Sequence, residues 1–437
     1  MSRYDDLDRE ALVRLLERRD AERQLGLVWE RDEIEAERAL NNDYVALDLD
    51  PALSHGEAPW GNLIIEGDNY DALRALRATH KGAIKCIYID PPYNTGNRDF
   101  VYNDRFVDRT HRFRHSLWLE FMYRRLVLAK ELLAYDGVIF VSIDDNEMFR
   151  LGMLMERVFG EDNRLGVLIW KNVTDNNPSR VVTEHEYILC YARDKDALEP
   201  AWKSTDVVKK DAMLAVQTEL LARTSDPSEL QREYTSWFRA NREQLAPLDN
   251  YKYIDAGGIY AGSRSVHNPG KEGYRYDVLH PVTGLPCKQP LMGYRFPPET
   301  MNALVENGRV LFGDDQTKLV ELKVYLSDYR EKLASVLELD GRAGANEVRS
   351  VFSGDKVFNN PKPAALVERL LSFVLAGGQT VLDFFGGSGT TAEAVSRLNL
   401  QDGGNRRFIL VSNTEATDET PDKNLCRDVC AERVRRV

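Results

Sequence analysis

Two short segments carry residue types that could do chemistry, and each follows an apolar run. The first, D-P-P-Y-N-T-G, extends from Asp90 to Gly96 after the run IKCIYI. Pro91 and Pro92 fix the backbone and contribute carbonyl groups without N–H donors, so that together with Asp90 the loop presents hydrogen-bond acceptors. Tyr93 adds a flat ring. Acceptors beside an aromatic ring suit a planar group that bears an NH₂, and a nucleobase flipped out of its duplex has both features.

The second segment, D-F-F-G-G-S-G-T-T, extends from Asp383 to Thr391 between the run QTVLDF and a helical pattern. Gly387 and Gly389 allow backbone to approach a ligand closely, and Thr390 and Thr391 can cap a helix whose first amides are free to bind. A strand, a glycine turn and a helix form nucleotide-cofactor sites in open α/β sheets. The turn lacks the lysine of a Walker A loop and the G-x-G-x-x-G spacing, which argues against an NTPase and a nicotinamide-dependent oxidoreductase.

Strands alternating with helices must position these two loops. We predict strands at 62–66, 84–89, 137–143, 166–170, 186–191, 379–384 and 406–411. We predict helices between 89 and 137, with Leu117, Phe121, Leu128 and Leu132 on one face, at 363–376, and from 390. This alternation predicts an α/β fold with a mainly parallel sheet covered on both faces.

The alternation is lost between about 200 and 350, where the chain is rich in turns. A polar, helix-prone stretch leads into segments such as DAGGIYAG, NPGKEG and HPVTGLP. We therefore expect a separate, mixed α+β module inserted into the sheet domain. The predicted division is a charged helical N-terminal arm (1–45), a first part of the sheet domain (46–200), the insert (201–350) and a second part (351–437).

Composition excludes several protein classes. Of 437 residues, 43% are hydrophobic and 29% charged, which argues against disordered and collagen-like chains. No apolar run approaches the ~20 residues that cross a bilayer, and the N-terminus has no apolar signal-peptide core, so we expect a cytoplasmic protein. The net charge of −12 argues against a generally polybasic nucleic-acid binder, but it allows an enzyme whose positive charge is confined to one cleft.

The five cysteines indicate neither a disulfide framework nor a zinc site, and we expect no metal. Only Cys426 and Cys430 are close in sequence, with the spacing of one helix face. We expect this pair to pack in the core.

Taken together, the two motifs resemble those of amino-methylating DNA methyltransferases that use S-adenosylmethionine. Their order is that of the permuted β class, in which the D-P-P-Y motif comes first, a target-recognition domain next and the cofactor glycine loop last. Within this class the chain looks most like the modification subunits of type III restriction systems, and the resemblance covers roughly residues 60–437. It implies a Rossmann-like, circularly permuted methyltransferase sheet with the target-recognition domain at 201–350.

The resemblance also implies roles for individual residues. Asp90, Pro91, Pro92 and Tyr93 would be catalytic. Asp68 in GDNYDAL would lie near the cofactor, Lys362 in FNNPKPAALV would approach its methionine carboxylate, and Glu415 would bind its ribose hydroxyls, with Asn413 as a competitor. The cofactor-binding residues of the glycine loop would be Asp383, Phe385, Gly387, Ser388, Gly389, Thr390 and Thr391.

Basic residues near these motifs are candidates for DNA contact. Arg105, Arg109, Arg112 and Arg114 concentrate positive charge after the D-P-P-Y loop. They could bind phosphates, or form a solvated loop paired with neighbouring aspartates. In the insert, the candidates for phosphate or base contact are Arg264, Lys271, Arg275, Lys288 and Arg295. The alternative for the insert is that it only stabilises a dimer.

The expected function is therefore a site-specific DNA methyltransferase. It would transfer a methyl group from S-adenosylmethionine to the exocyclic N6 amine of a flipped adenine in duplex DNA, as part of a restriction-modification or related defence system. The partners implied are double-stranded DNA, a second copy of the chain and a restriction (helicase–nuclease) subunit. The alternatives are an N4-cytosine methyltransferase and a catalytically inactive DNA-recognition subunit. The family's usual Asp at the position of Asp90 favours adenine.

Overall fold

The protein consists of two compact units, one of which interrupts the other in sequence. The structure is a computed structural model that describes residues 8–14, 27, 29, 45–96, 101–102, 105–106, 113–173, 180–202, 208–242, 245, 248–268, 270–416 and 422–437. The first unit comprises Met1–Trp202 and Leu333–Val437, and the second comprises Lys203–Lys332. Within the described part of the chain, every helix is too short or too polar to span a lipid bilayer.

The first unit is built on a sheet that its described residues form from eight strands. In the order in which they lie in the sheet, they are β1 (Leu63–Glu66), β14 (Arg407–Ser412), β13 (Thr380–Asp383), β2 (Ile84–Ile89), β5 (Leu133–Ile143), β7 (His185–Ala192), β6 (Arg164–Lys171) and β12 (Val336–Glu338). Neighbours run parallel, except that β7 is antiparallel to both β5 and β6. The predicted, mainly parallel sheet is thus confirmed.

The strand order is that of a doubly wound fold whose chain begins at a different strand. Counted from β13, the order from β1 to β5 reads 3-2-1-4-5, which is the order of doubly wound nucleotide-binding sheets. Because β1 and β2 precede β13 in sequence, the predicted circular permutation is confirmed. The order reverses between β13 and β2, and ligands of such sheets bind at this reversal, outside the carboxyl ends of the strands.

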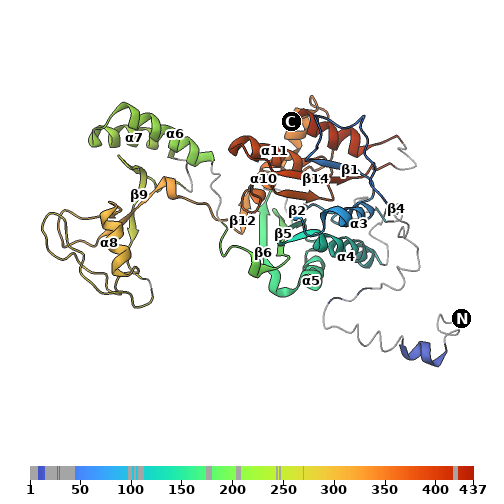
Figure 1. Cartoon of the computed structure of the whole chain (residues 1–437), viewed down its shortest axis with the longest axis horizontal. Helices are drawn as coiled ribbons and strands as arrows, with labels where there is room; N and C mark the ends of the chain where they lie inside the picture. Colours follow the sequence, from blue (N-terminus) through green and yellow to red (C-terminus); the bar gives the residue numbers. More distant parts are fainter. Residues whose placement is uncertain are drawn as a thin grey trace. The chain divides into compact units, whose positions relative to one another are not determined.

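Helices cover both faces of this sheet (Figure 1). In the first unit they are α3 (Asn69–His80), α4 (Arg114–Leu132), α5 (Met148–Phe159), α9 (Arg342–Val351), α10 (Ala364–Ser372), α11 (Thr390–Asp402) and α12 (Glu432–Arg436), with 3₁₀ turns at Glu161–Asn163 and Lys195–Ala197 and a π-helical turn at Cys426–Ala431. A two-stranded hairpin, β3 (Val101–Tyr102) and β4 (Arg105–Phe106), precedes α4.

The apolar core is split by the sheet into two clusters. On β2, Ile87 and Ile89 pack with α3, α4 and α5, whereas Cys86 and Tyr88 pack with α10 and α11. Successive strand residues point to opposite faces, so the apolar residues of β2 serve both clusters. Cys430 also lies in the second cluster, and both Cys426 and Cys430 are buried free thiols, which confirms that the pair packs in the core.

Among the described residues of the N-terminal arm, Leu27 and Trp29 pack against the core. Residues 9–14 are helical, and Trp29 is buried, with its Nε1 donating to Glu120 Oε2 of α4 at 2.8 Å. Arg157 of α5 lies over the indole ring, 4.9 Å from its centroid. This contact anchors the arm to the outer side of α4.

The second unit is a mixed α+β module, as expected for the insert. Its antiparallel sheet has the order β10 (Val310–Leu311), β11 (Glu321–Tyr325), β9 (Gly258–Ser265) and β8 (Tyr253–Asp255), and its helices are α6 (Val208–Arg223), α7 (Pro227–Asn241) and α8 (Pro298–Glu306), with a 3₁₀ turn at Leu326–Asp328. Ile254 and Ile259 pack against Tyr234 and Phe238 of α7.

The compact insert is shorter than the 201–350 range drawn from sequence. Residues from 333 onward belong to the first unit, where β12 pairs with β6 and α9 follows. β12 is a three-residue edge strand, too short to produce a recognisable pattern. The strands predicted at 62–66, 84–89, 137–143, 166–170, 186–191, 379–384 and 406–411 are confirmed to within a few residues.

Candidate active site

The D-P-P-Y loop leaves the carboxyl end of β2, at the reversal of strand order. Trp118 of α4 donates from Nε1 to the carbonyl oxygen of Pro92 at 2.7 Å. Asn94, whose φ is +57°, is fully buried and donates to Glu147 Oε1 at 2.5 Å. Asparagine tolerates this left-handed backbone better than most residues. The loop is therefore held at two points by buried partners from outside it.

Asp90 and Tyr93 meet two residues from distant parts of the chain. The hydroxyl oxygen of Tyr93 lies 2.8 Å from Asp90 Oδ1 and 2.7 Å from Glu186 Oε2, on the second residue of β7. The ammonium of Lys362, which precedes α10, lies 2.8 Å from Asp90 Oδ2, 2.8 Å from the Tyr93 hydroxyl and 3.2 Å from Glu186 Oε2. These four side chains form one polar cluster, called here the carboxylate–lysine cluster.

The two carboxylates of this cluster keep Lys362 and Tyr93 protonated. Burial acts to lower the pKa of Lys362, but the negative charges of Asp90 and Glu186 and their hydrogen bonds outweigh it, so the pKa is raised and the amine stays an ammonium. Burial, followed by the same two carboxylates, raises the pKa of Tyr93 well above its usual value. The hydroxyl therefore keeps its proton. Asn172 donates to the other oxygen of Glu186 at 2.8 Å.

The glycine turn lies at the end of β13, beside the D-P-P-Y loop. Asp383 links the two ends of the turn. Its carboxylate accepts hydrogen bonds from the amide of Phe385 at 3.0 Å and from Thr391 Oγ1 at 2.6 Å. Burial raises the pKa of Asp383 to about 7, although both hydrogen bonds oppose the shift. Gly387 and Gly389 have φ of +48° and +81°, values that favour glycine.

A fully buried arginine supports the turn from behind. Arg433 of α12 donates to Ser388 Oγ and Thr390 Oγ1, both at 3.0 Å, and its guanidinium pairs with Glu393 at 2.7 Å. Since Ser388 and Thr390 are themselves buried, the arginine satisfies polar groups that water does not reach.

Two further predicted cofactor residues lie at the ends of neighbouring strands. Asp68, after β1, caps α3 by accepting from the amide of Tyr70 at 2.8 Å and pairs with Arg125 at 3.1 Å. Glu415, after β14, accepts from Lys423 Nζ at 2.7 Å. Because β1, β14, β13 and β2 are parallel neighbours, the loops that carry Asp68, Glu415, the glycine turn and Asp90 share one edge of the sheet.

Lys362, which we expect to approach the methionine carboxylate of a cofactor, lies between the two motifs. Its side chain contacts Asp90, Tyr93 and Glu186. Its carbonyl oxygen accepts from Thr390 Oγ1 at 3.2 Å. Lys362 thus connects the two motifs, through its side chain to one and its backbone to the other.

The candidate DNA-binding residues are only partly within the described chain. Arg109 and Arg112 lie outside the described residues, and only the backbone of Arg105 is described, in β4. Arg114 is the first residue of α4, with Nη2 lying 3.2 Å from His115 Nε2. In the second unit, the candidate residues are all exposed: Arg264, Lys271, Arg275, Lys288 and Arg295.

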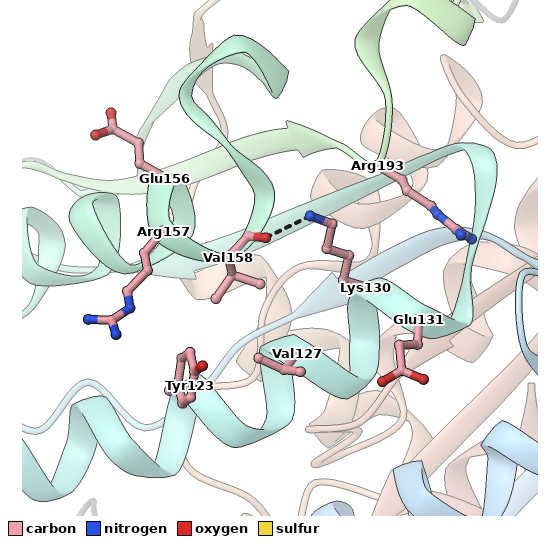
Figure 2. Close-up of a pocket in the computed structure, with 8 residues that line it drawn as sticks. All are labelled: Tyr123, Val127, Lys130, Glu131, Glu156, Arg157, Val158 and Arg193. Carbon is pink, nitrogen blue, oxygen red and sulfur yellow. Dashed lines mark hydrogen bonds between the residues drawn. The ribbon is translucent and has the colours of Figure 1, made fainter. Parts of the chain in front are cut away.

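A separate cavity of about 660 Å³ is lined mainly by residues of α4 and α5 (Figure 2). The described residues that line it include none of the predicted site residues; they are Tyr123, Val127, Lys130, Glu131, Glu156, Arg157, Val158 and Arg193. Lys130 donates across it to the carbonyl oxygen of Val158 at 2.8 Å. This cavity is not part of the candidate active site.

Glu186 and Arg433 are site residues that sequence reasoning missed. The sequence predicts only a strand for the segment that contains Glu186. A carboxylate at the start of this otherwise apolar run is nevertheless a signal of a polar group placed at a site. Arg433 sits in a charged C-terminal segment, where nothing in the sequence separates a buried arginine from its exposed neighbours.

Comparison with known proteins agrees with this geometry. A family model for DNA methylases of the N6/N4 type matches residues 84–412. The chain is 47% identical over 385 residues to the Mod subunit of the type III restriction-modification enzyme EcoP15I from Escherichia coli, in an alignment that covers 83% of this chain and 60% of that protein. It is 32% identical over 415 residues to the StyLTI Mod subunit from Salmonella typhimurium, covering 86% of this chain and 57% of that protein.

A shorter relative is matched over most of its length. The type II methyltransferase M.KpnI from Klebsiella pneumoniae is 27% identical over 381 residues, which covers 81% of each chain. The chain spans about three-fifths of the length of the type III subunits that it matches. The match of the family model covers more than half of the chain and includes both motifs, so the chain belongs to the N6/N4 DNA methylase family.

Proposed function

We propose that the chain transfers a methyl group from S-adenosylmethionine to the N6 amine of adenine in duplex DNA, as the modification component of a restriction-modification system. One observation carries the proposal. The D-P-P-Y loop and the glycine turn end neighbouring parallel strands, β2 and β13, at the reversal of strand order where such sheets bind ligands. A catalytic loop and a cofactor loop are thereby adjacent.

The residues around the glycine turn fit S-adenosylmethionine. A Cβ atom added at Gly387 would lie 3.1 Å from the ring of Phe358, and any side chain there would strain the backbone. The turn therefore requires glycine at this position. The backbone amides of the first turn of α11, which follows the glycine turn directly, suit a carboxylate. Glu415 and Asp68 offer carboxylates for hydroxyl and amino groups, and Phe385, beside Phe121 and Phe384, offers an aromatic ring. When bound, S-adenosylmethionine supplies a methyl group already activated by its sulfonium.

The residues of the D-P-P-Y loop would orient the target amine. An aromatic amine is a poor nucleophile because its lone pair is delocalised into the ring. Asp90 and the carbonyl of Pro91 would accept its two hydrogens and so favour a pyramidal nitrogen with a directed lone pair. The carbonyl of Pro92 is already engaged by Trp118. Tyr93 would stack on the base, a contact of about 1–3 kcal/mol in single-strand complexes. Positioning and electrostatics would thus account for the rate.

The second unit would be the target-recognition domain. Its exposed basic residues support contact with phosphates and base edges, and its compact fold supports an independent recognition module. The similarity to type III Mod subunits supports a restriction subunit as a further partner. A second copy of the chain is the other partner that we propose.

N4-cytosine methylation is the second candidate, because the exocyclic amine of cytosine poses the same chemical problem. The deciding experiment incubates the protein with unmethylated genomic DNA and labelled S-adenosylmethionine, and then identifies the modified nucleoside by mass spectrometry. N6-methyladenine is the expected product. N4-methylcytosine would establish the second candidate, and DNA binding without label would indicate a recognition subunit without catalysis.

A further inference from the structure

The carboxylate–lysine cluster has more polar contacts than hydrogens to fill them. Its five contacts are those of Lys362 with Asp90, Tyr93 and Glu186, and those of the Tyr93 hydroxyl with Asp90 and Glu186. An ammonium has three hydrogens and a phenol has one. Four hydrogens cannot fill five contacts, so one of the two short O···O contacts of Tyr93 lacks a hydrogen while both carboxylates are ionised.

The cluster also carries a net negative charge. Two carboxylates and one ammonium leave one uncompensated charge in a site where Lys362 is 8% exposed. Such a cluster can take up one proton at low electrostatic cost, because the proton would fill the missing hydrogen bond.

Methylation of an amine releases one proton. The amine nitrogen forms a bond to the methyl carbon, the carbon–sulfur bond breaks with its electron pair on sulfur, and one amine hydrogen leaves as a proton. The positive charge of the sulfonium is replaced by that of the proton. An acceptor close to the amine therefore completes the balance.

Resting on the proposed function, we propose that this proton passes from Asp90 through the Tyr93 hydroxyl to Glu186, with Lys362 as the fixed countercharge. Tyr93 Oη lies within hydrogen-bond distance of both carboxylates, so it can accept from one as it donates to the other. It need not ionise. Glu186 is then a positioning residue that acts through Tyr93.

The surroundings of Glu186 support this role. It lies opposite Trp170 of β6 in the strand register, and Asn172 holds its second oxygen. Outside the cluster, Glu186 interacts electrostatically with Tyr88 on β2 and with Asp144 after β5. Burial, together with the charge of Glu186, raises the pKa of Asp144. Asp144 thus places a second carboxyl group near the proton acceptor that we propose.

The test compares single-turnover methyl transfer in the wild type, Glu186→Gln and Tyr93→Phe on unmethylated genomic DNA. With its internal acceptor the wild type should be insensitive to buffer base. Each variant must release the proton to solvent, so its rate should fall by about 10²-fold and rise with imidazole concentration and with pH. The double variant should lose no more than either single variant. Affinity for S-adenosylmethionine in a calorimetric titration should not change in Glu186→Gln.

Asp145→Asn is the matched control, because it removes one negative charge from an exposed carboxylate outside the cluster. Asp145 Oδ1 accepts a hydrogen bond from the Tyr187 hydroxyl at 2.9 Å. This variant should behave like the wild type. Glu186→Asp keeps an acceptor and should stay insensitive to buffer, which distinguishes proton uptake from folding. The inference would be overturned if the rate of Glu186→Gln fell without any response to buffer. It would also be overturned if the rate fell only because the cofactor binds more weakly. In both cases the wild type would still label adenine. A wild type that labels no DNA would overturn the proposed function itself.

Discussion

The ammonium of Lys362 lies 2.8 Å from the carboxylate of Asp90, while the carbonyl of the same lysine accepts a hydrogen bond from Thr390 at the start of α11. One residue thus links the D-P-P-Y loop to the glycine turn. A movement of either loop therefore affects the other, because separating a buried ammonium from its carboxylate partners is energetically costly.

Replacing Asp90 by Ala should reduce methyl transfer by at least about 10³-fold, within the range of lost acid–base and positioning groups. Affinity for S-adenosylmethionine should persist, because Glu186 still neutralises Lys362 and the glycine turn is untouched. Single-turnover labelling and calorimetry measure the two quantities separately. Equal loss of both would contradict the assignment of Asp90 to the target base.

Replacing Gly387 by Val should abolish cofactor binding. The added Cβ would lie 3.1 Å from Phe358, and a β-branched residue is strained at a φ of +48°. Gly403→Val is the control, since Gly403 has a φ of +68° and no atom within 4 Å of the added Cβ. It should lose stability but keep its affinity. Similar calorimetric affinities for both variants would place the cofactor elsewhere.

Replacing Arg433 by Met should lower the free energy of unfolding by about 3 kcal/mol, because breaking a buried ion pair leaves polar groups unpaired. Arg397 still contacts Glu393, which limits the loss. Urea unfolding measures the change. The control is Arg435→Met on the same helix, where only the exposed pair with Glu432 is lost and the change should stay within about 0.5 kcal/mol. Comparable losses would mean that burial of Arg433 contributes nothing.

The buried carboxyl of Asp383 should make stability depend on pH. Its pKa of about 7 in the folded protein exceeds the ordinary value of 3.8, so the folded state binds the proton more tightly. The resulting stabilisation is complete below the ordinary value and is lost as pH rises through about 7. The free energy of unfolding of the wild type relative to Asp383→Asn should therefore fall between about pH 4 and about pH 7, by at most about 4 kcal/mol.

Asp402 provides a control of opposite sign. A hydrogen bond from Arg406 lowers the pKa of Asp402, so its contribution is present at higher pH and is lost as pH falls into the acidic range. Urea titrations at a series of pH values should show the two differences moving in opposite directions. A difference for Asp383→Asn that does not change with pH would show that the carboxyl is ionised throughout.

Replacing Lys288 or Arg295 by Ala should weaken DNA binding and reduce the slope of log affinity against log salt by about 1 each. Both side chains are exposed on the second unit. Fluorescence anisotropy with a labelled duplex at several salt concentrations measures the slope. Lys318→Ala is the control, because Lys318 is already paired with Asp314 at 3.3 Å and should change the slope less. Unchanged slopes for Lys288 and Arg295 would remove them from the DNA-binding surface.

The sequence predicted the sheet because its signals are local. The runs that became β2, β5 and β13 are apolar, and D-P-P-Y and the glycine turn follow two of them directly. The order of these motifs also predicted the permutation, since chain order fixes which strand carries which loop. The three-residue β12 was not predicted because an edge strand this short leaves no periodic pattern.

The composition of the carboxylate–lysine cluster was decided by the tertiary structure. Glu186 reaches Tyr93 because the antiparallel β7 lies next to β5, and Lys362 reaches Asp90 from a segment more than 260 residues further along the chain. The burial of Arg433 and the raised pKa of Asp383 depend in the same way on what packs around them. Spacing along a chain determines motifs and strands, whereas charge pairing and desolvation depend on distances in space, which only the folded chain sets.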